Sequence, residues 1–358
     1  MHLENGLFVL NDNEMKSFEP AQEFIQPKKE VVWNQSRALS DLLVDVNNIQ
    51  AACVDYAEVN LNSSEFFIRD GVPFLSFYDD GEKVEKKFTP HSFTQFCNIV
   101  GVPGSYIKKC MTKGDWGNRL ASRNVCDWLY NSHLPNNYLV RGYNDQIRGI
   151  LSERFVPYDA PEVVKSLIEN IDENQFSVVG TMIDSERFHC RIINKSFLNI
   201  KGDDLCWGFY IDSSDVGRGA LNITLFIWRQ ACTNGMVVAM GKSDLFYKVH
   251  RGTIEEFGSG IRYAIDNAEP VVNKTVELIN NASNILIKDT SKVLDLVKHY
   301  TGLSDRDTEA LMEFYRTSGY DSSMWGLVNA ITEQAQKYTL EKRIDLEKGA
   351  GKLLLAAA

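Results

Sequence analysis

The segment from Ala220 to Trp228 constrains the fold of this 358-residue chain more than any other, because its residues fall into two alternating sets. One set is Leu221, Ile223, Leu225 and Ile227, and the other is Asn222, Thr224, Phe226 and Trp228. Successive side chains of a β-strand point to opposite faces of the sheet. Both sets contain large apolar side chains. We therefore predict an internal strand of a sheet that has other elements packed against both of its faces.

Neighbouring segments predict the rest of this sheet. Residues 177–183 and 187–193 flank a short polar turn and suit a hairpin, and Cys206–Ile211 is a further strand. Residues 252–287 have the pattern of a long amphipathic helix, interrupted near Pro270. The chain is predicted to be α+β, with a central, mostly antiparallel sheet, long helices and a helical C-terminal part.

Composition bounds the class of protein. With 44% apolar residues the chain can bury a large core, and we divide it into an N-terminal arm (1–60), an α+β core domain (61–290) and a helical C-terminal segment (291–358). No apolar run reaches the length of a membrane span, and the first residues do not resemble a signal peptide. We expect a cytoplasmic protein of a bacterial host cell. Its seven cysteines include no Cys-x-x-Cys pair, so we expect them to be reduced.

Charge is distributed unevenly along the chain. The formal net charge is −10, yet residues 81–154 hold 11 basic and 6 acidic side chains, whereas residues 31–80 hold 2 and 8. A local basic patch can bind phosphates on a molecule that is acidic overall, because affinity depends on local contacts. The alternative is that these charges are ordinary solvated faces.

Known catalytic and metal-binding patterns fit poorly. Gly235–Ser243 has five residues, where a phosphate-binding loop has four, before its Gly-Lys-Ser. His189 and Cys190 are neighbours in a predicted strand and point to opposite faces, so they do not chelate a metal together. Cys232 has no histidine partner that the sequence indicates. We therefore predict no enzymatic activity, no cofactor and no metal.

Arginines are the stronger candidates for a site. Arg187, His189 and Arg191 alternate along one strand and so share a face. The candidate nucleic-acid-binding cations are Arg141, Arg148, Arg154, Arg187, Arg191, Arg218, Arg229, Lys242, Lys248 and Arg251. Guanidinium groups bind phosphate through paired hydrogen bonds, and nearby aromatic rings can stack on bases. Structural ion pairs with nearby carboxylates are the alternative, and the available partners are Asp159, Asp184, Glu186, Asp212 and Asp215.

Five segments carry a family resemblance, in the same order along the chain. Residues 148–155, 212–217, 229–235 and 325–333 are similar to motifs of the phage/plasmid-like protein family, domain of unknown function 932, and Gly101–Tyr106 is similar to an earlier step. The resemblance extends over roughly residues 66–355. The residues that carry it most directly are Ser152, Ser214, Gly217, Cys232, Asn234, Gly235, Trp325 and Asn329.

The resemblance implies a phage or plasmid origin. We expect a homo-oligomeric protein that binds single-stranded nucleic acid, with annealing in replication or recombination as its role. Its order of strands and helix from Ser177 to about Ala282 is similar to the core of Rad52-like annealing proteins. A phage-encoded interaction protein that modulates a host or defence complex is the alternative. In either case the loop at 217–219 and the turn at 234–235 are expected to meet near Arg148 and Gly149.

Overall fold

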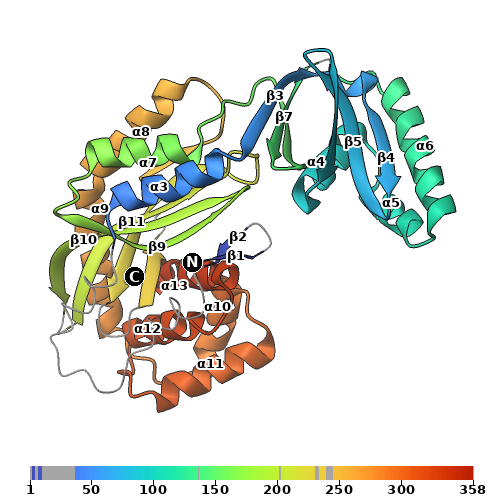
Figure 1. Cartoon of the computed structure of the whole chain (residues 1–358). Coiled ribbons are helices and arrows are strands. Elements are labelled where there is room, and N and C mark those ends of the chain that lie inside the picture. Colours follow the sequence, from blue (N-terminus) through green and yellow to red (C-terminus); the bar gives the residue numbers. More distant parts are fainter. Residues whose placement is uncertain are drawn as a thin grey trace.

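The computed structural model describes residues 2–4, 7–9, 37–135, 137–200, 203–229, 234–238 and 245–357. The fold is α+β with a mostly helical C-terminal part, as predicted (Figure 1). It contains two sheets, each with its own hydrophobic cluster. No helix in these ranges is both long and apolar enough to cross a membrane.

The first sheet, sheet A, is antiparallel throughout and contains the predicted central strands. Its strands, in order across the sheet, are β1 (His2–Glu4), β2 (Leu7–Val9), β9 (Phe176–Asp184), β10 (Phe188–Ile200), β11 (Asp203–Ser213), β12 (Leu221–Arg229) and β13 (Asn234–Val238), and β14 (Phe246–Lys248) also pairs with β12. The predicted hairpin is the β9–β10 pair, in which Phe188 lies opposite Ile183.

Both faces of β12 are buried, as its alternating sequence predicted. Leu225 belongs to a cluster shared with α3 (Leu39–Gln50), α7 (Ala160–Asn170), α8 (Ile254–Asp266) and α9 (Ala268–Asn284). Phe226 and Trp228 belong to a smaller cluster on the other face, which includes Ile344 of the last helix. The C-terminal helices are α10 (Ser291–Thr301), α11 (Asp305–Thr317), α12 (Met324–Ala335) and α13 (Leu340–Ala357). The predicted interruption near Pro270 is the break between α8 and α9.

The second sheet, sheet B, forms a lobe that the sequence analysis had placed within a single core domain. Its strands, in spatial order, are β3 (Cys53–Val59), β7 (Tyr138–Tyr143), β8 (Gln146–Ser152), β6 (Glu82–Phe88), β5 (Val72–Asp79) and β4 (Glu65–Arg69). The pair β6–β8 is parallel and the others are antiparallel. Three helices, α4 (Pro90–Val100), α5 (Gly104–Met111) and α6 (Asp115–Asn131), supply apolar side chains to its core.

The lobe is an insertion into the chain of the rest of the molecule. Helices α3 and α7 pack against each other, and residues 53–152, which lie between them, make up sheet B and its helices. Figure 1 shows the lobe projecting to one side, with α5 and α6 at its far end. We call residues 53–152 the lobe and the remaining described residues the body. The expected arm of residues 1–60 includes α3, which packs in the body, and β3, which belongs to the lobe.

Candidate functional site

Two arginines of the predicted set lie on neighbouring strands of the lobe, and both are buried. Arg141 of β7 lies opposite Gly149 of β8, next to Arg148. The Arg141 guanidinium donates to both carboxylate oxygens of Asp159, at 2.7 and 2.6 Å, and to both oxygens of Asp55 at 2.9 Å. Bidentate pairs of this kind are among the strongest hydrogen bonds in proteins. Arg141 thus joins Asp159, at the N-terminal end of α7, to Asp55 of β3.

The second arginine binds the loop that follows β11. Nη1 of Arg148 donates to both carboxylate oxygens of Asp215 at 2.8 Å, and Arg141 donates to the Asp215 carbonyl at 2.9 Å. Burial raises the pKa of Asp215, and the nearby Arg148 opposes this shift. Burial is the largest single influence on Asp159 and raises its pKa, but the hydrogen bonds from Arg141 and the charges of Arg141 and Arg148 together lower the pKa of that carboxyl. We call Arg141, Arg148, Asp55, Asp159 and Asp215 the arginine cluster.

The same loop attaches the lobe to the body. The carbonyl oxygen of Val216 accepts hydrogen bonds from His91 Nε2 at 3.0 Å and from Gln95 Nε2 at 2.8 Å, both on α4. The Val216 side chain is fully buried against Gly149, where an added Cβ would come within 2.9 Å of it. The loop therefore lies beside Arg148 and Gly149, as its sequence predicted. Its contacts are those of a joint between two parts of the fold.

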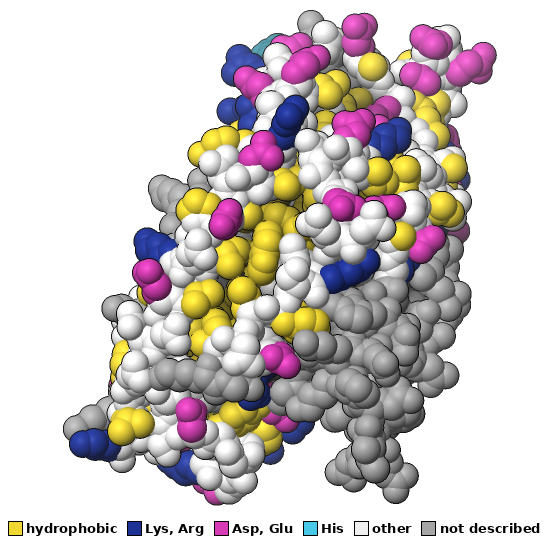
Figure 2. All heavy atoms as spheres, turned by 90° about the vertical axis from the view of Figure 1, so that its left-hand side faces the viewer, with side chains coloured by type: hydrophobic (Ala, Val, Ile, Leu, Met, Phe, Trp, Pro, Cys, Tyr) yellow, Lys and Arg dark blue, Asp and Glu magenta, His cyan; other side chains and the backbone are white. Residues whose placement is uncertain are grey.

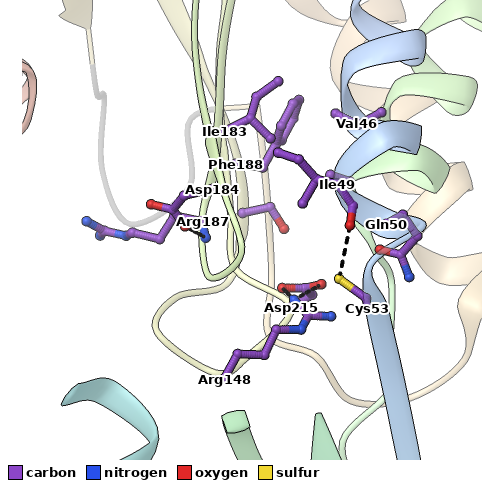
Figure 3. A pocket seen from close by; sticks show the side chains of 12 residues that line it. Val46, Ile49, Gln50, Cys53, Arg148, Ile183, Asp184, Arg187, Phe188 and Asp215 are labelled. Carbon is purple, nitrogen blue, oxygen red and sulfur yellow. Dashed lines mark hydrogen bonds and ion pairs between the residues drawn. The ribbon is translucent and has the colours of Figure 1, made fainter. Parts of the chain in front are cut away.

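A small cavity adjoins the arginine cluster. Figure 3 shows Arg148 and Asp215 on one side of it, with Gln50 and Cys53 on another. Nε and Nη2 of Arg148 have no hydrogen-bond partner among the described residues, but the cavity holds about 20 Å³, which is room for about one water molecule. Burial raises the pKa of Cys53 to about 11, so the thiol is protonated at neutral pH. The cavity has no room for a phosphate or a base, and its thiol is a poor nucleophile.

The predicted arginine row on β10 is covered by a helix. Arg191 is 8% exposed and donates to Glu347 of α13 at 2.6 Å, and Arg187 lies 3.5 Å from Glu341 of the same helix. Glu347 itself is fully buried. Arg187 and Arg191 lie along one face of the strand as the alternating sequence predicted, but carboxylates of α13 pair with them. The prediction that these side chains face solvent and a bound strand is wrong for Arg191.

His189, between the two arginines, is neutral. Its Nδ1 lies 3.1 Å from the Asp212 carboxylate and 3.0 Å from the hydroxyl of Tyr210. Burial lowers the pKa of His189 to about 4, although Asp212 opposes the shift. The imidazole is therefore uncharged at pH 7, so it adds no positive charge to the row.

A second cluster gathers motif residues at the opposite end of β12. The Asp203 carboxylate accepts from Arg229 at 2.5 Å and from the Trp325 indole at 3.1 Å. Arg229 ends β12, whereas the loop precedes Leu221, so the strand separates the two clusters by roughly 26 Å. Residues 234–235 pair with β12 as part of β13. The prediction that they form a turn beside Arg148 is wrong, because the hydrogen bonds of β12 hold them in the sheet.

Of the remaining predicted cations, two are paired with carboxylates, two are exposed, and one lies outside the described residues. Arg218 pairs with Glu186 at 2.8 Å, and Lys248 pairs with Glu256. Two exposed residues, Arg154 and Arg251, have no carboxylate partner within the described ranges. Their segments lie side by side, since the Val156 amide donates to the His250 carbonyl at 3.0 Å. Lys242 lies outside the described residues.

The other motif residues have mostly structural surroundings. Ser214 donates to the Glu186 carbonyl and accepts from the Arg218 amide, while Gly217 has φ +79°. Gly235 lies under the Phe226 ring, where a Cβ would clash at 2.3 Å. Ser152 is exposed at the end of β8, Asn329 is buried within α12, and Asn234 contributes backbone to β13. Cys232 lies outside the described residues.

Sequence reasoning missed the surface of α5 and α6. Exposed cations on these helices and the turn between them are Lys108, Lys109, Lys113, Arg119 and Arg123, against two acidic residues, Asp115 and Asp127. Exposed aromatic side chains on α6 are Trp116, Trp128 and Tyr130, at 58%, 48% and 60% exposure. We call this surface the α5–α6 face. The basic excess in residues 81–154 indicates this surface, whereas the cations predicted within that range were Arg141, Arg148 and Arg154.

Comparison with known families identifies most of the body. The family model described as a domain of unknown function, DUF932, matches residues 149–355. The match begins within β8 and so leaves out nearly all of the lobe, including Gly101–Tyr106, which had resembled a family step. No curated protein and no solved structure matches the chain.

Proposed function

The chain belongs to the DUF932 family, and we propose that it binds single-stranded nucleic acid through the α5–α6 face of its inserted lobe. The observation that carries the proposal is that some cations are buried and paired while others are exposed. Arg141, Arg148 and Arg191 are buried and paired, whereas five cations of the α5–α6 face are exposed. Exposed cations are free to exchange counter-ions for phosphates.

The α5–α6 face has few internal counter-ions. Arg123 lies 3.8 Å from Asp127, and both side chains are exposed. The other four cations have no carboxylate within ion-pair distance in the described part of the chain. An exposed pair at this distance contributes little, about 0–1 kcal/mol, so a phosphate competes readily with Asp127.

Exposed aromatic rings among these cations favour a single strand over a duplex. Trp116, Trp128 and Tyr130 offer ring surfaces that unpaired bases can stack on, and each stacked base contributes about 1–3 kcal/mol. A duplex hides the faces of its bases and presents only its backbone and groove edges. Binding of this kind needs positioned cations and rings but no catalytic residue. Replication or recombination of a phage or plasmid, with strand annealing by several protomers, is the proposed setting.

Fluorescence anisotropy tests the proposal directly. We expect the full-length protein to bind a fluorescent single-stranded oligonucleotide at about 50 mM salt and to lose affinity steeply by about 200 mM. Lys109→Ala/Lys113→Ala should weaken binding several-fold. The matched control is Lys274→Ala/Lys288→Ala, which removes the same charge from exposed positions of the body and should leave affinity unchanged. No binding at low salt, or equal losses in both variants, contradicts the proposal.

A second candidate function, contact with another protein, is favoured by one face of the body. Figure 2 shows hydrophobic side chains gathered in a strip along that face, with acidic and basic side chains scattered around it. Large exposed hydrophobic residues of the body include Tyr263 and Leu286, at 61% and 65% exposure. Contiguous exposed apolar patches are typical of protein interfaces. Light scattering over a concentration series tests for a homo-oligomer, and a constant monomer mass contradicts self-association.

A further inference from the structure

We propose that the groove between α5 and α6 holds one unpaired base of a bound strand and selects guanine. The inference rests on the proposed function and adds the chemical group that the lobe recognises. The groove is lined by Val102, Pro103, Tyr106, Asn124, Asp127, Trp128, Asn131 and Ser132.

The shape of the groove follows from one glycine. At Gly117 an added Cβ would lie 2.1 Å from the carbonyl oxygen of Cys110, so the start of α6 touches the end of α5. The hollow lies toward the other ends of the helices, between Pro103 and Asn131, and measures about 900 Å³. This is the size of sites that hold small organic ligands. A base with part of its sugar fits within such a space.

The walls of the groove suit a planar aromatic ligand. Tyr106 lines one side and Trp128 the other, and the Asn124 amide donates to the Tyr106 hydroxyl at 2.7 Å. That hydrogen bond joins α5 to α6 and fixes the position of the tyrosine ring. Pro103 adds a rigid apolar surface at the mouth. Single-stranded bases bind such sites by stacking while their edges form hydrogen bonds.

Among the described residues, Asp127 is the one acidic side chain that lines the groove. Its pairing with Arg123 at 3.8 Å leaves the carboxylate 67% exposed. A carboxylate repels phosphate, so its presence in the groove favours a base edge there and places the phosphates along the cations outside. Ionised aspartate only accepts hydrogen bonds, through two oxygens. The Asn131 amide nitrogen already donates to the Asp127 carbonyl at 2.6 Å, which orients this part of the helix.

The hydrogen-bonding pattern of the groove distinguishes among the bases. Guanine presents two adjacent N–H donors, at N1 and N2, on its Watson–Crick edge, and these match the two oxygens of one carboxylate. Adenine, cytosine and thymine each present donors at one position of that edge. Asp127 therefore favours guanine, in the same way that carboxylates accept from base donors in duplex readout.

Competing oligonucleotides test the inference on the full-length chain. Three fluorescent strands of about 12 thymines, within the site size of single-strand binders, carry a central thymine, adenine or guanine. The guanine strand should bind about tenfold more tightly than the other two, because one bidentate contact to a base discriminates by roughly that much. Asp127→Asn should abolish this preference and keep or raise the affinity for the thymine strand. Asp115→Asn, the control with the same charge change on the same helix, should retain the preference.

Each result separates the inference from the function on which it rests. Equal binding of all three strands overturns guanine selection while the nucleic-acid proposal stands. A preference that persists in Asp127→Asn also overturns it, since another group must then read the base. Absence of binding by all three strands overturns the proposed function and the inference together.

Discussion

The interior of the molecule and the far end of the lobe use positive charge in opposite ways. The buried arginines at the joint between body and lobe and under α13 have carboxylate partners, as Arg141 has Asp159 and Arg191 has Glu347. On the far end of the lobe, five cations are exposed on two helices and the turn between them. The family model covers residues 149–355, which make up most of the body, and begins within β8. The buried arginine pairs thus hold the fold, while the surface proposed to bind nucleic acid lies in the insertion.

Desolvation explains why the buried arginines are paired with carboxylates. A guanidinium removed from water loses its hydration and needs carboxylates and hydrogen bonds in return. Arg141 obtains them from Asp55, Asp159 and the Asp215 carbonyl, so all of its donor groups face partners. A phosphate would have to displace these partners and enter a region without room for it. An exposed lysine has no such barrier.

The largest expected effect concerns the arginine cluster. Arg141→Met leaves the carboxylates of Asp159 and Asp55 without their partner, and removal of one member of a buried pair costs about 3–5 kcal/mol. Urea denaturation followed by circular dichroism measures the loss. Lys113→Ala on the α5–α6 face is the comparison and should change the free energy of unfolding by less than about 0.5 kcal/mol. Equal losses for the two variants would erase the distinction between the buried arginine cluster and the exposed α5–α6 face.

A smaller effect is expected at the joint between the two parts. Gly149→Ala places a Cβ within 2.9 Å of Val216, and overpacking of this kind costs about 1–3 kcal/mol. Because the contact is between parts, we expect the variant to loosen the attachment of the lobe before it unfolds either core. Limited proteolysis should cut the variant near the joint faster than the wild type. The control is Gly219→Ala, where an added Cβ meets no atom within 4 Å.

The pH dependence of stability tests whether the row under α13 is buried in solution. The pKa of His189 falls from 6.5 to about 4 on folding, so the unfolded state takes up a proton first as the pH decreases. Stability from this group is present above pH 6.5 and is lost as the pH falls toward 4. Between pH 7 and 5 the wild type should lose about 2 kcal/mol more than His189→Gln. Arg187, Arg191, Asp212 and Lys348 face His189 and remain in both proteins. If the wild type and His189→Gln lose stability in parallel as the pH falls, His189 is exposed to solvent.

Local patterns in the sequence predicted the elements well, and long-range contacts explain what they did not predict. The alternating residues of 221–228 predicted β12 and its two buried faces, and Pro270 predicted the break between α8 and α9. The burial of Arg191 depends on Glu347, 156 residues later, and no local pattern links the two. Likewise, no local pattern indicated that Arg229 and Trp325 both contact Asp203. The α5–α6 groove depends on the contact between the start of α6 and the end of α5, which the sequence indicates only by Gly117.

The smallest expected effect on the free energy of unfolding is at Arg119. The position is informative because loss of the side chain should change nucleic-acid binding instead. Arg119 is exposed on α6 and has no ion pair within the described residues, so Arg119→Ala should alter the free energy of unfolding by less than about 0.5 kcal/mol. If the side chain contacts a phosphate of a bound single strand, its loss should reduce the slope of log affinity against log salt by about 0.7. Anisotropy titrations at several salt concentrations measure that slope. An unchanged slope removes Arg119 from the contact surface, and a loss of stability like that of Arg141→Met would show that the α5–α6 face also serves the fold.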